Sequence, residues 1–169
     1  MTVTEAIRKR RSIRKFKPGA EVTDGQVKLM LEAAMVSPSA CNSRPWEFIV
    51  VRDRELLDRI RAAHPYTGML ETASLAIVMI ALPETQTEPI MTDYYPQDCG
   101  AATENILLQA VGLGLGACWC GVYPKADRIA EISGILGTKK LPFCVIAVGV
   151  PDEEPDPRGA YDEGKVTYM

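Results

Sequence analysis

The residues whose types and spacing most suggest chemistry stand near the amino end, in the stretch RKRRSIRKF at positions 8–16. Six of these nine residues are Lys or Arg, and Ser12 adds a hydroxyl. Forked guanidinium groups and a serine hydroxyl make a good cradle for phosphate oxygens. The stretch therefore predicts a site for a phosphate-bearing cofactor. The alternative is a solvated basic helix end that offsets the helix dipole.

The charge of the remaining chain narrows the choice of anion. Residues 1–17 hold seven of the 19 Lys and Arg but one of the 22 acidic residues, which leaves 12 basic and 21 acidic residues elsewhere, a net charge of −9. Most of such a surface would repel nucleic acid. A small anion bound locally fits better, so we expect no nucleic-acid partner. The rival of a different class is a module that binds nucleic acid or an acidic membrane through the basic stretch.

Three glycines in VGLGLGAC, at positions 112, 114 and 116, hint at a dinucleotide-binding fingerprint. That fingerprint needs a strand before it, a helix after it and the spacing GxGxxG. Here a predicted helix precedes the glycines, a predicted strand follows them, and the spacing is GxGxG. We interpret them as the end of a buried helix that lets the next strand pack closely.

Cys118 and Cys120 form a CxC pair, and His64 is the sole histidine. A structural zinc site needs about four ligands, and the other three cysteines are scattered, so we predict no metal site and interpret the pair as small buried side chains. His64 lies in a loop-like segment without an evident partner, so we expect it at the surface. An odd, scattered set of five cysteines argues against a disulfide framework and suits a reducing cytoplasm.

The order of local patterns predicts the elements that must position these residues. Capping signals and helical periodicity predict helices over residues 2–11, 23–36, 54–63, 97–115 and 127–136. Apolar, β-branched runs predict strands over 46–52, 74–82, 117–123 and 143–150, with an edge strand at 165–169. Residues 84–96 are predicted to form a polar surface connection.

The chain length and this intermixing of elements predict one domain with helices layered on a sheet. The most apolar run, at 74–82, is far too short to span a bilayer, and no signal peptide is evident at the start of the sequence. We therefore expect a cytoplasmic protein without a membrane partner.

Four elements of the sequence, taken in order, resemble those of the FMN-dependent nitroreductase family. The basic stretch is similar to the family's Arg-x-Ser-x-Arg/Lys-x-Phe signature, through Arg10, Ser12, Arg14 and Phe16. The other three matches are PSACNSRPWEF at 38–48, the helix and strand over 94–121, and GVPDEEPDPR at 149–158. Together they cover nearly the whole chain.

The resemblance implies an α+β fold in which helices flank a mixed sheet, in a single nitroreductase-like domain over residues 1–169. It also implies an intertwined homodimer with two FMN sites at the subunit interface. The acidic, proline-rich tail, residues 151–169, would extend onto the partner subunit. Its last residues, KVTYM, would suit addition of a strand to the partner's sheet.

Roles for individual residues are also implied by the resemblance. Positions that hold the FMN phosphate are matched by Arg10, Ser12 and Arg158, and Arg11 fills a neighbouring contact position. Arg14 matches the basic position near the N1–C2=O edge, where a cation favours the charge of reduced flavin. The loop that reaches the flavin from the partner subunit is matched by Pro38, Ser39, Ala40 and Asn42. The strip beneath the isoalloxazine is matched by Cys118, Trp119, Cys120 and Gly121.

Within that strip, a backbone N–H of Cys120 or Gly121 would approach flavin N5, and Gly121 would be small because the ring lies against it. The sequence also departs from the family pattern. Cys120 stands where many relatives carry an acidic or polar group, and Met69 stands near a position that often grips the flavin edge. The chain lacks a long insertion before the central helix, so the site is expected to be open.

The activity implied by the resemblance is a two-step, ping-pong oxidoreductase. NADPH or NADH would reduce a tightly bound FMN, which would then pass electrons to a small acceptor such as a nitroaromatic or a quinone. No catalytic side chain is required, because the cofactor carries the redox chemistry. The alternatives are a family member with a non-nitro substrate, acting by dehydrogenation, enoate-type reduction or reductive dehalogenation, and a non-catalytic flavin-binding protein.

Overall fold

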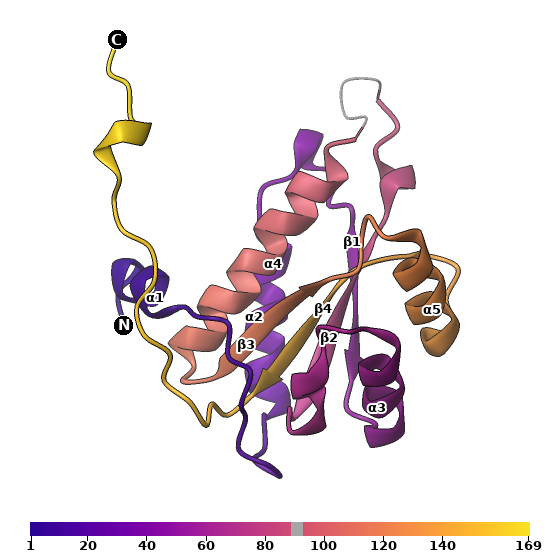
Figure 1. Cartoon of the computed structure of the whole chain (residues 1–169). Coiled ribbons are helices and arrows are strands. Elements are labelled where there is room, and N and C mark those ends of the chain that lie inside the picture. Colours follow the sequence, from indigo (N-terminus) through magenta and orange to yellow (C-terminus); the bar gives the residue numbers. More distant parts are fainter. Residues whose placement is uncertain (89–92) are drawn as a thin grey trace.

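Helices alternate with strands along the chain, whose computed structural model describes residues 1–88 and 93–169 (Figure 1). Within these residues the α-helices are Val3–Lys9 (α1), Asp24–Met35 (α2), Arg54–Ala63 (α3), Tyr95–Gly112 (α4) and Ala126–Leu136 (α5). The strands are Trp46–Val51 (β1), Leu75–Ala81 (β2), Gly116–Gly121 (β3) and Leu141–Gly149 (β4). The predicted connection over 84–96 includes residues 89–92, which lie outside the described residues.

Local capping signals fix where the first two helices begin. At α1 the Thr2 side chain accepts a hydrogen bond from the Glu5 backbone N–H, and the Glu5 side chain accepts one from the Thr2 backbone N–H. Thr23 and Gln26 form the same capping box at α2. Helix α4 ends at Gly112 and not at the predicted residue 115, because Gly114 takes a left-handed φ of 73° and turns the chain into β3.

The four strands form one sheet in the order β1-β2-β4-β3, and every neighbouring pair is antiparallel. Every residue of β2 is buried, as its unbroken apolar run requires for a central strand covered on both faces. The predicted α+β class with flanking helices is confirmed. The predicted sheet was mixed, and among the described residues the parallel pairing is one isolated bridge between Ser12 and Ala117, at the edge of β3 that faces away from β4.

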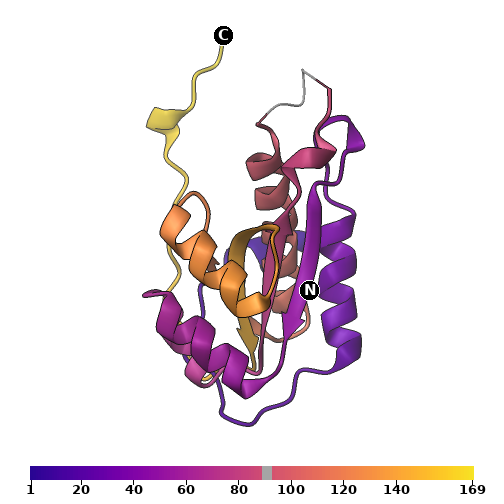
Figure 2. The same cartoon turned by 90° about the vertical axis from the view of Figure 1, so that its right-hand side faces the viewer.

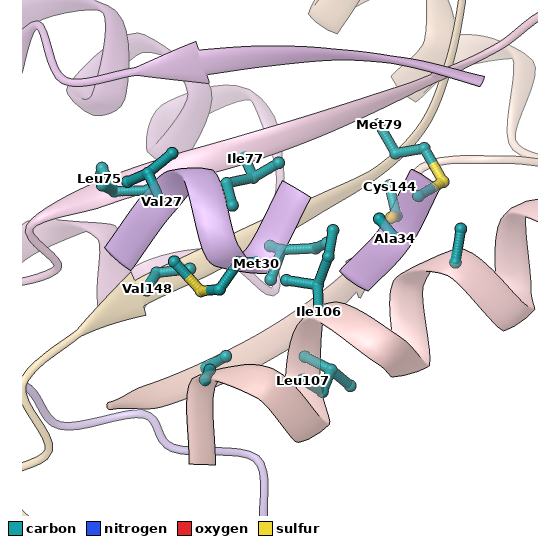
Figure 3. Packing of buried hydrophobic residues seen from close by; sticks show 14 of the residues in the cluster. Val27, Met30, Ala34, Leu75, Ile77, Met79, Ile106, Leu107, Cys144 and Val148 are labelled. Carbon is teal, nitrogen blue, oxygen red and sulfur yellow. The ribbon is translucent and has the colours of Figure 1, made fainter. Parts of the chain in front are cut away.

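Two layers of helices cover the sheet, with α2 and α4 on one face and α3 and α5 on the other (Figure 2). Met30 of α2 and Ile106 of α4 pack against Ile77 and Val148 in the first core (Figure 3). The second core lies under α3 and α5 and includes Cys118 and Cys120. Because side chains of a strand alternate between faces, β3 contributes to both cores.

The tail after Pro151 leaves the body of the molecule in an extended path (Figures 1 and 2). It contains a short turn of helix at Glu163–Lys165, and the ring of Tyr168 is exposed. No strand forms over residues 166–169, although 165–169 was predicted as an edge strand, because no strand within residues 1–88 and 93–169 pairs with it. No helix among the described residues is long and apolar enough to cross a membrane.

Candidate functional site

The basic stretch continues past α1 as an extended segment that is held against the sheet. The Ile13 N–H donates to the Ala117 carbonyl oxygen at 3.0 Å, and Ile13 and Phe16 are buried. A Cβ added to Gly116 would lie 2.8 Å from Ile13, and one added to Gly149 would lie 2.8 Å from Phe16. These two glycines therefore let the segment pack closely enough to hold Ser12 and its basic neighbours in fixed positions.

Arg158, which was predicted to bind the phosphate, lines one cleft together with Arg11, which was predicted to make a neighbouring contact. The cleft lies between α1 and the tail, and its cationic lining consists of Arg8, Lys9, Arg11 and Arg158. The Arg11 Nε donates to the Asp156 carbonyl oxygen at 3.2 Å, which ties the tail to the basic stretch. Among the described residues, the side chains of Arg8 and Arg158 form no ion pair, so their charge is available to an anion.

The other basic residues of the stretch point elsewhere. Arg10 Nε lies 3.2 Å from a carboxylate oxygen of Glu104 on α4. The Arg14 side chain and the Ser12 hydroxyl lie near the Cys118 thiol and both lower its pKa. The predicted residues thus form two neighbouring groups, one at the cleft and one beside β3.

The outer edge of β3 presents backbone groups that β4 does not use. The Val122 N–H donates to the Phe143 carbonyl oxygen across β4, while the Ala117 carbonyl oxygen accepts from Ile13 on the opposite side. Since backbone groups alternate in direction along an antiparallel strand, the N–H groups of Trp119 and Gly121 also point away from β4. Of the two predicted N5 donors, the geometry favours Gly121 over Cys120.

His64 is 1% exposed, so the prediction that it lies at the surface is wrong. Its Nε2 lies 2.8 Å from the Gly121 carbonyl oxygen, and its Nδ1 accepts from the Tyr66 backbone N–H at 3.2 Å. Nε2 therefore carries the proton that it donates to Gly121. The histidine fixes the end of β3, a role that no local sequence signal could show, because the contact joins positions 57 residues apart.

The thiols of Cys118 and Cys120, on the face of β3 that α3 and α5 cover, differ in acidity. A hydrogen bond from Cys120 lowers the pKa of the Cys118 thiol to about 7, against the effect of burial and with help from Arg14 and Ser12. The same hydrogen bond, together with burial, raises the pKa of Cys120. Cys118 is therefore the thiol that ionises first. The prediction that both are small buried side chains of a strand is confirmed, and all five cysteines are free.

The loop that carries Pro38, Ser39, Ala40 and Asn42 lies at the amino end of α4, away from α1 and the cationic cleft of the same chain (Figure 1). Buried Asp98, in the first turn of α4, accepts from the Ala40 N–H at 3.1 Å and from Gln86 Nε2 at 2.9 Å. Burial raises the pKa of Asp98, partly offset by these hydrogen bonds. Asp98 holds the loop in place, and sequence reasoning missed it.

The same loop has an unusual backbone. Cys41, Asn42 and Arg44 all have φ between 48° and 56°, in the left-handed region that non-glycine residues seldom adopt. Such conformations persist where the surroundings enforce them, and they concentrate at ligand-binding sites. The loop is therefore a candidate part of a binding site, although it does not touch the cleft of its own chain.

Comparison of the sequence and the fold with those of known proteins identifies the family. The sequence model of the Nitroreductase family matches residues 7–64 and 62–150. The chain belongs to the Nitroreductase family. A relative from Methanothermobacter thermautotrophicus, named "Putative NADH dehydrogenase/NAD(P)H nitroreductase", is 43% identical over 168 residues, which are 98% of this chain and 86% of the relative.

Solved Nitroreductase-family structures share the fold over nearly the whole chain. An "FMN-dependent Nitroreductase" from Clostridium difficile has a TM-score of 0.85 at 34% identity, with 96% of each chain covered. A "putative nitroreductase in complex with fmn" from Desulfovibrio desulfuricans has a TM-score of 0.84 at 30% identity, with 100% of this chain and 97% of the other covered. The resemblance inferred from the four sequence elements is confirmed.

Proposed function

We propose that this protein is an FMN-dependent NAD(P)H oxidoreductase that passes electrons to small acceptors, with nitroaromatics and quinones as the acceptor classes. The observation that carries the proposal is the convergence of Arg11 and Arg158 with two further cations, Arg8 and Lys9, in one cleft. Relatives that cover almost all of this chain carry NAD(P)H nitroreductase and FMN-dependent names, which supports the cofactor and the donor.

The residues present fit a bound flavin phosphate and ring. The cleft offers cations without ion-pair partners among the described residues, which suits a phosphate dianion. Gly121 lacks a positive φ, and the nearest heavy atom to an added Cβ would be 3.9 Å away. Nothing inside the chain therefore requires glycine at this position, whereas a planar group lying against the strand would.

The roles of this chain's own residues follow from that fit. Arg11 and Arg158, which line the cleft, would hold the phosphate, and the Gly121 N–H would donate to N5. Arg10, whose Nε lies 3.2 Å from Glu104, would have to leave that carboxylate to join them. Arg14 would place positive charge near the N1–C2=O edge. The redox chemistry that FMN supplies when bound is acceptance of electrons from NADH or NADPH and, in a second half-reaction, donation to the acceptor.

We further propose that the working unit is a homodimer in which the loop 38–42 of one subunit completes the site of the other. The loop lies far from the cleft of its own chain but has the strained backbone of a binding loop. The tail carries apolar side chains that the chain itself leaves exposed, including Tyr161 and Tyr168. In the part of the chain that the structure describes, β1 is an edge strand whose outer side pairs with no other strand, and residues 165–169 of a partner would pair there.

The deciding measurement is the visible spectrum of the purified protein, followed by addition of NADPH or NADH without oxygen. We expect a flavin spectrum that bleaches and that recovers when a quinone or nitroaromatic is added. A flavin spectrum that neither nucleotide bleaches would favour a family member with a non-nitro substrate or a non-catalytic flavin-binding protein. A colourless protein that also fails to bind added FMN would contradict the proposal.

A further inference from the structure

A cluster of sulfur-containing side chains lies on the face of β3 that α3 and α5 cover. The proposed electron transfer does not use these side chains. Cys118 and Cys120 are two positions apart on one strand, so their side chains share a face, and each thiol shifts the pKa of the other. Cys120 Sγ lies 4.0 Å from Met69 Sδ. Cys118, Cys120 and Met69 belong to the same core cluster and are 2%, 4% and 8% exposed, so the three side chains lie where water is largely excluded.

We propose that Cys118, Cys120 and Met69 bind one soft monovalent metal ion, of the Cu(I) class, through two thiolates and a thioether. Thiolate and thioether sulfurs are the ligands that select soft ions. A first-row metal bonds thiolate sulfur at about 2.3 Å, so two sulfurs arranged 120° apart on one ion lie about 4.0 Å from each other. The distance between Cys120 Sγ and Met69 Sδ already has that value.

The surroundings favour a monovalent ion over a divalent one. Two thiolates around a monovalent ion leave one negative charge, and Arg14 lies close enough to Cys118 to offset it, although Glu153 opposes that effect. Binding breaks the two S–H bonds, releases both protons to solvent and changes no oxidation state. Among the described residues, no three His, Cys, Asp or Glu side chains converge on a metal-binding position, which leaves zinc without its usual four ligands.

The site would also communicate with the strand that the proposed function uses. Cys120 precedes Gly121, whose carbonyl oxygen is held by His64, and the Cys120 thiol lies 3.1 Å from the Tyr66 carbonyl oxygen. An ion bound by Cys120 and Met69 would fix the same short stretch of backbone. The metal site itself rests on the sulfur geometry alone and does not depend on FMN.

The test uses Ag(I), a soft monovalent ion, with any bound flavin kept oxidised so that it cannot reduce the ion. The full-length protein, with its thiols reduced, is titrated without oxygen in an excess of glutathione, which removes ions held by single thiols. We expect one Ag(I) per chain by native mass spectrometry, and protection of two cysteines, mapped to positions 118 and 120, from alkylation by N-ethylmaleimide.

Variants separate this site from the other thiols. Cys118→Ser and Cys120→Ser should each abolish retention of Ag(I), and Met69→Leu, which keeps the side-chain volume, should weaken binding on the order of tenfold. Cys41→Ser is the matched control, because Cys41 is exposed and distant in the sequence, and it should retain one ion. Thermal melts followed by circular dichroism confirm that each variant is folded.

Several results would overturn the proposal. These are retention of Ag(I) by either folded serine variant, its loss in Cys41→Ser, or no retention by the unmodified protein. A disulfide between Cys118 and Cys120 that persists in glutathione and excludes the ion would also overturn it. If both serine variants unfold, the Met69→Leu titration and the alkylation map of the unmodified protein decide the question, since protection of any other pair of cysteines contradicts the site.

Discussion

Arg11 and Arg158 illustrate how much of the site rests on single side chains brought together by the fold. They are 147 positions apart in the sequence, yet they line the same cleft beside α1. A hydrogen bond to a charged group contributes about 1.5–3 kcal/mol when its partner is also ionised. One arginine on the FMN phosphate should therefore change retention of the cofactor by at least an order of magnitude.

Replacement of Arg158 by Ala should weaken FMN binding by roughly tenfold to a hundredfold, because the phosphate loses one cationic donor. The measurement is the dissociation constant for FMN from flavin fluorescence after removal of the cofactor. Arg59→Ala is the matched control, since Arg59 is an exposed arginine of α3 on the other side of the sheet, and it should leave the constant unchanged. Equal affinity in both variants would remove Arg158 from the phosphate site.

His64 stabilises the fold by bonding to the backbone at Gly121 and Tyr66, a role that the sequence did not predict. Replacement of His64 by Ala should lower the free energy of unfolding by about 2–4 kcal/mol, because the Gly121 carbonyl and the Tyr66 N–H lose their partner and a cavity forms. Urea unfolding followed by circular dichroism measures it. Tyr66→Ala keeps the backbone N–H that bonds to His64 and should cost under about 1 kcal/mol. Similar losses in both variants would contradict this account.

At the scale of elements, the parts that were predicted from the sequence are those with local causes. The Thr23–Gln26 capping box and the apolar run of β2 each carry their own signal, and both formed as predicted. Helix α4 begins at Tyr95, two residues before the predicted start, because Pro96 suits the first turn of a helix. The direction of the Gly121 N–H and the hydrogen bond from the Ala40 N–H to Asp98 depend on contacts between distant segments. No local sequence pattern therefore reveals them.

The packing of the basic stretch on β3 depends on the absence of one side chain. Gly116→Ala should destabilise the protein by about 1–3 kcal/mol, because the new Cβ would lie 2.9 Å from the Cβ of Ile13, which cannot rotate away. The same substitution should lower FMN retention, since it displaces the segment that carries Ser12 and Arg14. Chemical denaturation and cofactor content measure the two effects.

The control for that substitution is Gly134→Ala, in the last turn of α5, where an added Cβ meets no atom within 4 Å. Alanine is the better helix former, so this variant should gain about 0.5–1 kcal/mol of stability and keep its FMN. A Gly116→Ala protein that is as stable and as well loaded as the unmodified chain would show that the segment is not held by close approach to β3.

At the scale of the whole molecule, the chain by itself leaves surfaces that suggest a second copy. The tail projects from the body with Tyr161 74% and Tyr168 84% exposed. An apolar groove lined by Val27, Leu31, Met35 and Val50 lies beside the free edge of β1. Exposed apolar side chains and a free strand edge on one molecule are features that association of two copies would cover.

Removal of residues 159–169, which keeps Arg158, tests this arrangement. We expect the full chain to sediment as a dimer at micromolar concentration and the shortened chain to dissociate at concentrations where the full chain does not, because the tail no longer covers the partner. The melting temperature of the full chain should rise with protein concentration, as it does when unfolding is coupled to dissociation. Cofactor content should fall with dissociation, since the loop 38–42 that completes each site would come from the lost partner. A full chain that sediments as a monomer while holding FMN would assign the whole site to one subunit, and the strained backbone of that loop would then need a cause within its own chain.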